Sequence, residues 1–144
     1  MERREKLAKI VNSLRRKVDF DFKVNYFNNR LKLQKYVFLL RRYGIDLGYS
    51  YNYYIRGPYS PELADDYYNL PKIEEEIELP EDFLKLIKNK SERWLELASS
   101  LVMVFEKYPG ISEEDAIRIV AGSKLEDPKK LREILRELKE HKAI

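Results

Sequence analysis

The sequence contains one stretch, LKLQKYVFLL at residues 31–40, whose side chains are apolar on almost every face of a helix. Asn28 or Asn29 can cap such a helix and Gly44 is typical of a helix end, so we expect a helix over Leu31–Tyr43. A helix that is apolar nearly all round lies buried at the centre of a protein. Its basic residues must then reach solvent or pair with acids near the helix ends; these are Lys32, Lys35, Arg41 and Arg42.

A second stretch, YSYNYYIR at residues 49–56, alternates between two faces as a half-buried strand does. One face carries Tyr49, Tyr51, Tyr53 and Ile55, and the other carries Ser50, Asn52, Tyr54 and Arg56. Gly57-Pro58 should end this strand. Ser60 followed by Pro61 and an acid is typical of a helix start, so a short helix should follow and stop at Pro71.

Apolar residues at helical spacing, together with capping residues, predict further helices over residues 3–17, 80–88, 91–108, 112–121 and 128–142. Two segments stay open. Residues 18–26 alternate as a strand does, but they fit an extended loop pinned by aromatic side chains equally well. The acidic residues 72–79 are either an edge strand or a linker. The expected fold class is mainly α (α+β), a compact helical domain with a small antiparallel β element.

The length of 144 residues suits one domain, and 44% hydrophobic with 37% charged residues is typical of a globular protein. We expect a single domain with three parts, at residues 1–71, 72–90 and 91–144. The absence of cysteine excludes disulfides, thiolate nucleophiles and cysteine-bound zinc. The charged N-terminus and the lack of a long apolar run predict a cytoplasmic protein that does not enter a membrane.

The charge of the chain is unevenly distributed along the sequence. Residues 1–60 carry 14 Lys/Arg against 5 Asp/Glu, a net charge of +9, whereas residues 61–144 carry 14 against 20, a net charge of −6. Such a distribution can steer an acidic partner or a nucleic acid towards the N-terminal half. The interpretation that the small total charge favours is that two halves of opposite charge attract each other and pack together.

The sequence offers little for catalysis. Its one histidine, His141, lies in the last predicted helical turn, where a cation suits the helix dipole. The five glycines form no phosphate-binding loop, and the run of residues 74–76 is typical of a solvated acidic surface rather than a metal site. We therefore expect a protein that is not an enzyme and that has no catalytic residues, cofactor or metal ion.

The tyrosine-rich segment is the first candidate for a binding surface. Tyrosine and arginine are enriched among the residues that dominate the affinity of protein interfaces. Tyr54, Arg56 and Tyr59 lie on the more polar strand face and at the turn, so we predict that they contact a partner protein. The alternative is that these side chains are only exposed packing. Stacking of single-stranded bases on the tyrosines is a further, less favoured possibility.

The last two predicted helices, which follow a long packing helix, outline a helix-turn-helix. Four basic residues share an outward arc of the final helix and could contact phosphates, namely Lys129, Arg132, Arg136 and Lys139. Neighbouring glutamates would weaken this potential, and the predicted connection from Gly122 to Asp127 is longer than the turn of a DNA-reading motif. DNA binding by these residues is therefore the alternative hypothesis.

Two short motifs resemble a known family. The helix motif Leu33-Gln34-Lys35, followed some twenty residues later by RGPYSP at residues 56–61, is similar to the SocA-like antitoxin (Panacea) domain and to uncharacterised YwgA-like proteins of archaea and bacteria. The residues that match are Leu33, Gln34, Lys35, Gly57 and Pro58. The antitoxin branch commonly varies after Gly-Pro, so the GPYSP of this chain places it nearer the uncharacterised branch.

The resemblance implies a compact, mostly helical and winged-helix-like protein that acts by contact and not by catalysis. Members of the antitoxin branch neutralise a toxin by binding it directly or by delivering it to a protease. We therefore expect an interaction or regulatory module whose partner is a protein, with a toxin as one candidate. The matching residues are expected to be architectural, with Gln34 and Lys35 satisfied by the Gly-Pro turn, because a buried helix must satisfy its polar groups.

Overall fold

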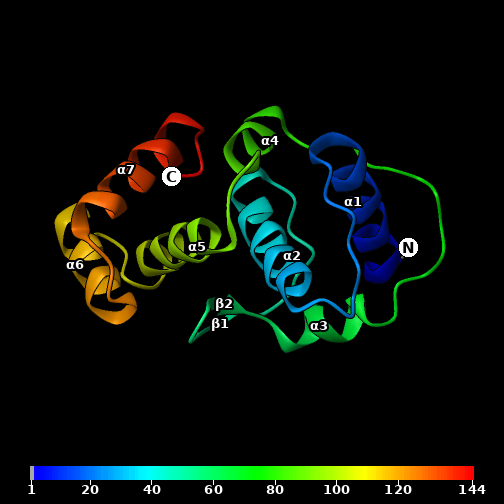
Figure 1. The fold of residues 1–144 in the computed structure, drawn as a ribbon, viewed down its shortest axis with the longest axis horizontal. Helices are drawn as coiled ribbons and strands as arrows, with labels where there is room; N and C mark the ends of the chain where they lie inside the picture. The colour runs from blue at the N-terminus through cyan, green and yellow to red at the C-terminus, as the bar shows by residue number, and fades with distance from the viewer. Residues whose placement is uncertain (1) are drawn as a thin grey trace.

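The structure is a computed structural model that describes residues 2–144. These residues form seven α-helices and one two-stranded antiparallel sheet (Figure 1). The elements are α1 (Arg3–Val18), α2 (Phe27–Leu40), β1 (Asn52–Tyr54), β2 (Gly57–Tyr59), α3 (Pro61–Tyr67), α4 (Glu81–Ile87), α5 (Glu92–Lys107), α6 (Glu113–Lys124) and α7 (Pro128–Glu140). The predicted mainly helical fold with a small antiparallel β element is confirmed.

Helix α2 lies at the centre of the molecule, between α1 on one side and α5 on the other (Figure 1). It packs against α5 and also contacts β2, α3 and α4. Every residue from Leu33 to Leu40 is buried, as the apolar pattern of this stretch predicts. The helix passes into a 3₁₀ turn at Arg41–Tyr43, and Gly44 follows with a φ of 87°, which is the predicted helix end.

The predicted start of α2 is wrong. The helix begins at Phe27 rather than Leu31, so Asn28 and Asn29 lie in its first turn and do not cap it. The Asn29 Oδ1 atom instead accepts a hydrogen bond from the backbone N–H of Lys23 at 2.7 Å. This asparagine therefore fixes the preceding loop, and the early start places the Phe27 side chain at the surface.

The tyrosine-rich segment forms a hairpin rather than one long strand. Strands β1 and β2 pair antiparallel, with Tyr54 opposite Gly57, and Ile55 and Arg56 form the turn between them. Gly57-Pro58 thus begins the second strand, where the sequence predicted the end of the first. The reason is that Gly57 has a φ of 89°, a conformation that glycine adopts easily. The chain can therefore reverse at Ile55 and Arg56, directly before Gly57, and not after it.

Because of this early reversal, only part of the predicted inner face is buried. Ile55 lies in the turn and is 87% exposed, although the alternation placed it with the buried tyrosines. Tyr49 is buried, and its hydroxyl donates a hydrogen bond to Asp66 Oδ2 at 2.7 Å. Tyr51 packs edge-on against Phe38, with ring centroids 5.0 Å apart. The alternation therefore holds through Tyr54 at the end of β1 and fails at the turn.

The two segments that the sequence left open are both loops. Residues 19–26 contain no strand. An aromatic contact holds this loop on α2, where Phe20 packs edge-on against Tyr36 with ring centroids 5.0 Å apart. Residues 72–79 are an extended linker that crosses α1. The Asn12 side chain donates hydrogen bonds to the backbone oxygens of Ile73 and Glu75, at 3.0 and 2.9 Å. Side chains of α1, and not another strand, satisfy this backbone.

Helix α6 is longer than predicted. It continues through Gly122 to Lys124, and Leu125 ends it in the left-handed conformation with a φ of 52°. Only residues 125–127 connect α6 to α7, so the predicted long connection from Gly122 is wrong. Glycine lowers helix propensity by only about 1 kcal/mol, and the packing of α6 against α5 and α7 outweighs that penalty.

Strand β2 begins in direct contact with α5. A Cβ atom added to Gly57 would lie 2.9 Å from Ser100 Oγ and 3.3 Å from the backbone oxygen of Glu96. Only glycine tolerates both the positive φ of this position and so close an approach of the backbone to α5. Gly57 thus lets the hairpin pack directly on the α5 backbone.

We predict that Gly57→Ala lowers the free energy of unfolding by about 2–4 kcal/mol, because backbone strain and overpacking add. Gly110→Ala is the matched control, since Gly110 has a φ of 86° but no atom within 4 Å of an added Cβ. The control should lose only the strain contribution, about 1–2 kcal/mol. Urea unfolding measures both, and equal losses would contradict the close packing of Gly57 on α5.

Candidate functional site

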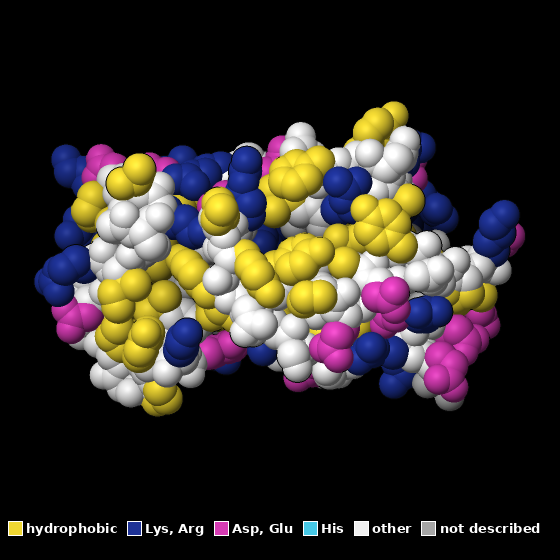
Figure 2. All heavy atoms as spheres, turned by 90° about the horizontal axis from the view of Figure 1, so that it is seen from below, with side chains coloured by type: hydrophobic (Ala, Val, Ile, Leu, Met, Phe, Trp, Pro, Cys, Tyr) yellow, Lys and Arg dark blue, Asp and Glu magenta, His cyan; other side chains and the backbone are white. Residues whose placement is uncertain are grey.

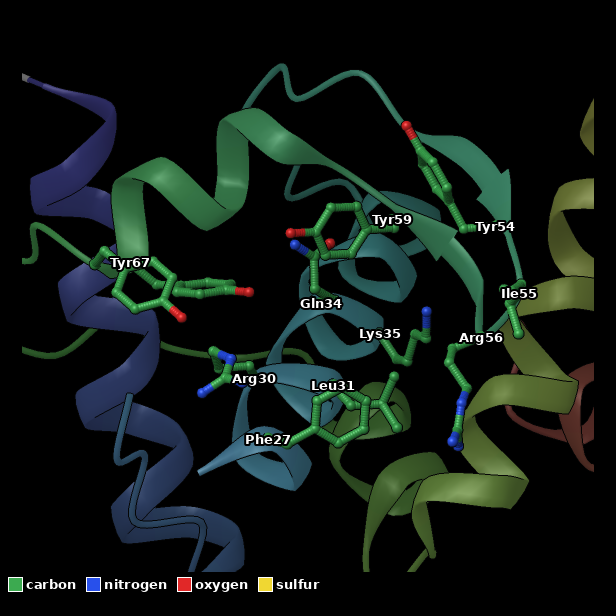
Figure 3. A pocket seen from close by; sticks show the side chains of 12 residues that line it. Phe27, Arg30, Leu31, Gln34, Lys35, Tyr54, Ile55, Arg56, Tyr59 and Tyr67 are labelled. Carbon is green, nitrogen blue, oxygen red and sulfur yellow. The ribbon is translucent and has the colours of Figure 1, made fainter. Parts of the chain in front are cut away.

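A groove of about 540 Å³ opens between the first turns of α2, the hairpin and the end of α3 (Figure 3). Its volume lies within the roughly 300–1,000 Å³ that is usual for ligand sites. Aromatic side chains from all three elements line it: Phe27 from α2, Tyr54 and Tyr59 from the hairpin, Tyr67 from α3 and Tyr68 directly after α3. We call this feature the hairpin groove.

The hairpin groove contains all three residues that the sequence predicted as partner contacts. Tyr54 and Tyr59 are diagonal neighbours across the hairpin, and their rings meet edge-on with centroids 5.4 Å apart. Tyr54 and Arg56 are exposed, and Tyr59 is half-buried. The structure therefore brings Tyr54, Arg56 and Tyr59 together at the surface of one concave site.

The sequence did not single out Phe27, which is central to this site. The guanidinium carbon of Arg56 lies 5.7 Å from the centre of the Phe27 ring, and that of Arg30 lies 5.8 Å from it. Both distances allow cation–π attraction. Arg30 is held in place because its Nη1 donates a hydrogen bond to the backbone oxygen of Val24 at 2.8 Å. The sequence signal that could have identified Phe27 is that it is a large aromatic residue outside the apolar pattern of its helix.

The helix motif Leu33-Gln34-Lys35 joins α2 to strand β2 and to Ser60, which follows it. The Gln34 side chain donates to the backbone oxygen of Ser60 and accepts from its backbone N–H, both at 2.9 Å. Lys35 Nζ donates to the backbone oxygen of Pro58 at 2.5 Å. Leu33 is fully buried in the core. These contacts are the ones expected of architectural residues, because they satisfy polar groups within the protein.

A buried cluster of charges lies beneath the hairpin. Lys124 Nζ is 3.3 Å from Glu96 Oε2 and donates to the backbone oxygen of Ile55 at 2.5 Å. Lys35, Glu96 and Lys124 are all buried. Burial lowers the pKa of Lys35 to about 7; the Glu96 carboxylate opposes this shift, and the positive charge of Lys124 adds to it. Lys35 therefore holds β2 at Pro58, and Lys124 holds the hairpin turn at Ile55.

The basic residues predicted as DNA contacts lie on α7, away from the hairpin groove, and three of the four are ion-paired. Arg132 contacts Glu114 at 3.2 Å, Arg136 contacts Glu140 at 3.1 Å, and Lys139 contacts Glu113 at 2.8 Å. Within residues 2–144, Lys129 is the member of this set without an ion pair. Acids of α6 and α7 therefore weaken the positive potential of the stripe, although the short connection between these helices suits a helix-turn-helix.

The described residues show neither a metal cluster nor a membrane-spanning helix. In the described part of the chain, no group of three or more His, Cys, Asp or Glu side chains is placed to hold a metal ion. None of the helices found between residues 2 and 144 has both the length and the apolar character required to cross a bilayer. His141 lies just after α7, where its backbone oxygen accepts a hydrogen bond from the Tyr43 hydroxyl at 2.7 Å.

Comparison with family models, with curated proteins and with solved structures finds no match to the chain. The hairpin groove and its buried supports are therefore the observations on which a functional proposal rests.

The stability of the protein should depend on pH through Lys35. Below pH 7 both the folded and the unfolded chain hold the lysine proton, whereas between about pH 7 and the ordinary lysine value of 10.5 only the unfolded chain holds it. Raising the pH through this range therefore favours the folded state. We expect the free energy of unfolding to rise from pH 7 to pH 10, by up to about 1.4 kcal/mol per pH unit.

Urea unfolding at a series of pH values measures this slope, and Lys35→Met should remove most of it. Groups elsewhere in the chain titrate equally in both proteins, so the difference between the slopes isolates Lys35. Equal slopes in the two proteins would show that Lys35 is charged in the folded state throughout this range.

Proposed function

We propose that this protein is a non-enzymatic interaction module that binds a partner protein through the hairpin groove. The observation that carries the proposal is the combination of an exposed aromatic and arginine surface with a concave site on a buried, hydrogen-bonded support. Aromatic residues and arginine contribute most of the affinity in many protein interfaces. Pre-organised sites also lose less conformational freedom on binding.

The surface around the hairpin groove is unusually apolar for a solvent-exposed region. Figure 2 shows hydrophobic side chains gathered over the middle of the face that carries the hairpin and α3, with lysine and arginine side chains among them. Phe27 is 52% exposed, Tyr68 is 57% exposed and Ile55 is 87% exposed. Contiguous apolar surface of this kind is typical of sites that bind another protein.

The resemblance of the LQK and Gly-Pro motifs to the SocA-like antitoxin domain supports the same class of function. Under the proposal, the partner is a protein whose activity is controlled by direct binding, and a toxin is one such partner. We place the module in the cytoplasm, because its lack of cysteine suits a reducing compartment.

Binding of DNA by α6 and α7 is the second candidate, favoured by the three-residue connection between residues 125 and 127. The ion pairs along α7 weaken it, because phosphates would have to displace carboxylates that already neutralise the basic stripe. A protein partner at the hairpin groove requires no such displacement.

Photocrosslinking tests the proposed surface directly. Ile55→p-benzoylphenylalanine places a crosslinker in the hairpin turn, and Leu125→p-benzoylphenylalanine is the control, since both residues are strongly exposed, at 87% and 92%. We expect a discrete protein adduct from the first variant and none from the second, in cells of the source organism. The purified partner should then bind wild type, and Phe27→Ala should weaken it at least about tenfold.

Two outcomes would contradict the proposal. One is a partner whose affinity, measured by calorimetry, is unchanged by Phe27→Ala. The other is binding of duplex DNA with a steep dependence on salt that weakens on Lys129→Ala or Arg136→Ala, which would assign the function to α7.

A further inference from the structure

We propose that the hairpin groove binds an acidic peptide segment that carries a bulky apolar side chain. This inference rests on the proposed function and names the chemistry of the partner. The apolar side chain would enter between the tyrosines, and the carboxylates would meet Arg30 and Arg56 at the entrance.

The charge of the groove is of one sign. Its charged lining residues are Arg30, Lys35 and Arg56, and no aspartate or glutamate lines it. Lys35 is buried and donates to Pro58, so the two arginines are the cations that a ligand would meet. A cationic apolar groove is complementary to an acidic segment and excludes a basic one.

These two arginines also differ from most others in the protein. In residues 2–144, Arg3, Arg4, Arg16, Arg41, Arg42, Arg93, Arg118, Arg132 and Arg136 all pair with a carboxylate. The described chain gives no carboxylate partner to Arg15, Arg30 or Arg56. Two of these three unpaired guanidinium groups therefore lie at the hairpin groove, in a protein that otherwise pairs its arginines.

The geometry leaves these guanidinium groups able to bind carboxylates. Each lies near the Phe27 ring, at 5.7 Å for Arg56 and 5.8 Å for Arg30, and Figure 3 shows them on opposite sides of it. Arg30 gives one N–H to Val24, and within the described chain Arg56 donates no hydrogen bond. Since a guanidinium group has five N–H donors, most of them are free for a planar carboxylate.

A peptide fits this site better than a nucleic acid does. Non-specific binding of a nucleic acid depends on many neutralised phosphates, roughly 6–10 in strongly salt-dependent proteins, and the groove offers two free cations. An acidic peptide needs only one or two carboxylates at the arginines, and its apolar side chain uses the aromatic lining.

A library of random short peptides, selected on the immobilised full chain, tests this inference. We expect the enriched peptides to be rich in aspartate and glutamate and to share a bulky aromatic or aliphatic residue. Fluorescence anisotropy of one enriched peptide should show at least about tenfold weaker binding to the Arg30→Ala/Arg56→Ala double variant. Arg15→Ala is the matched control, because Arg15 is exposed and unpaired but lies on α1 outside the groove, and it should bind as wild type does.

The outcomes separate this inference from the proposed function. Enrichment of neutral or basic peptides whose binding is lost in Phe27→Ala would overturn the acidic partner but keep the groove as a binding surface. Failure to enrich any peptide whose binding depends on Phe27 would overturn both. A random single-stranded oligonucleotide could instead bind more tightly than an enriched peptide and displace it. If the double variant also loses binding of this oligonucleotide, the groove is a nucleic-acid site.

Discussion

The structure depends on the hydrogen bonds by which α2 holds β2 and the residue that follows it, Ser60. Gln34 exchanges two hydrogen bonds with the backbone of Ser60, and Lys35 donates to the backbone oxygen of Pro58. All of these groups are buried, where an unsatisfied polar group would destabilise the fold by about 1–3 kcal/mol. Because Ser60 also caps α3 through its hydroxyl, the same contacts place the hairpin and α3 relative to α2. They therefore set the walls of the hairpin groove.

This arrangement separates the support from the contact surface. Lys35 and Lys124 hold the backbone of the hairpin from below, at Pro58 and at Ile55, while the side chains of the turn point to solvent. A binding surface on such a support needs little ordering when a partner arrives, so more of the interaction free energy appears as affinity. The polar groups of Gln34 and Lys35 are used in building the site, which leaves Arg56 and the aromatic rim exposed for the partner that we propose.

Local patterns predicted the features that depend on neighbouring residues. The burial of α2, its end at Gly44 and the start of α3 at Ser60 all follow from residue types within a few positions of each other. The length of the first strand was not predictable in this way, because the chain reverses where Gly57 packs on α5, and α5 lies far along the sequence. The place of Phe27 in the site was also hidden, since residues far apart in sequence form the groove and only folding brings them together.

Hydrogen exchange of the backbone amides, resolved by residue, tests the central claim that a buried support presents an exposed turn. The Ser60 amide donates to a buried Gln34 side chain, so the account predicts that it exchanges as slowly as the core amides of α2. The amides of Ile55 and Arg56 lie in the exposed turn and should exchange rapidly. Fast exchange at Ser60, equal to that of the turn, would show that α2 does not hold the hairpin and that the groove has no fixed shape.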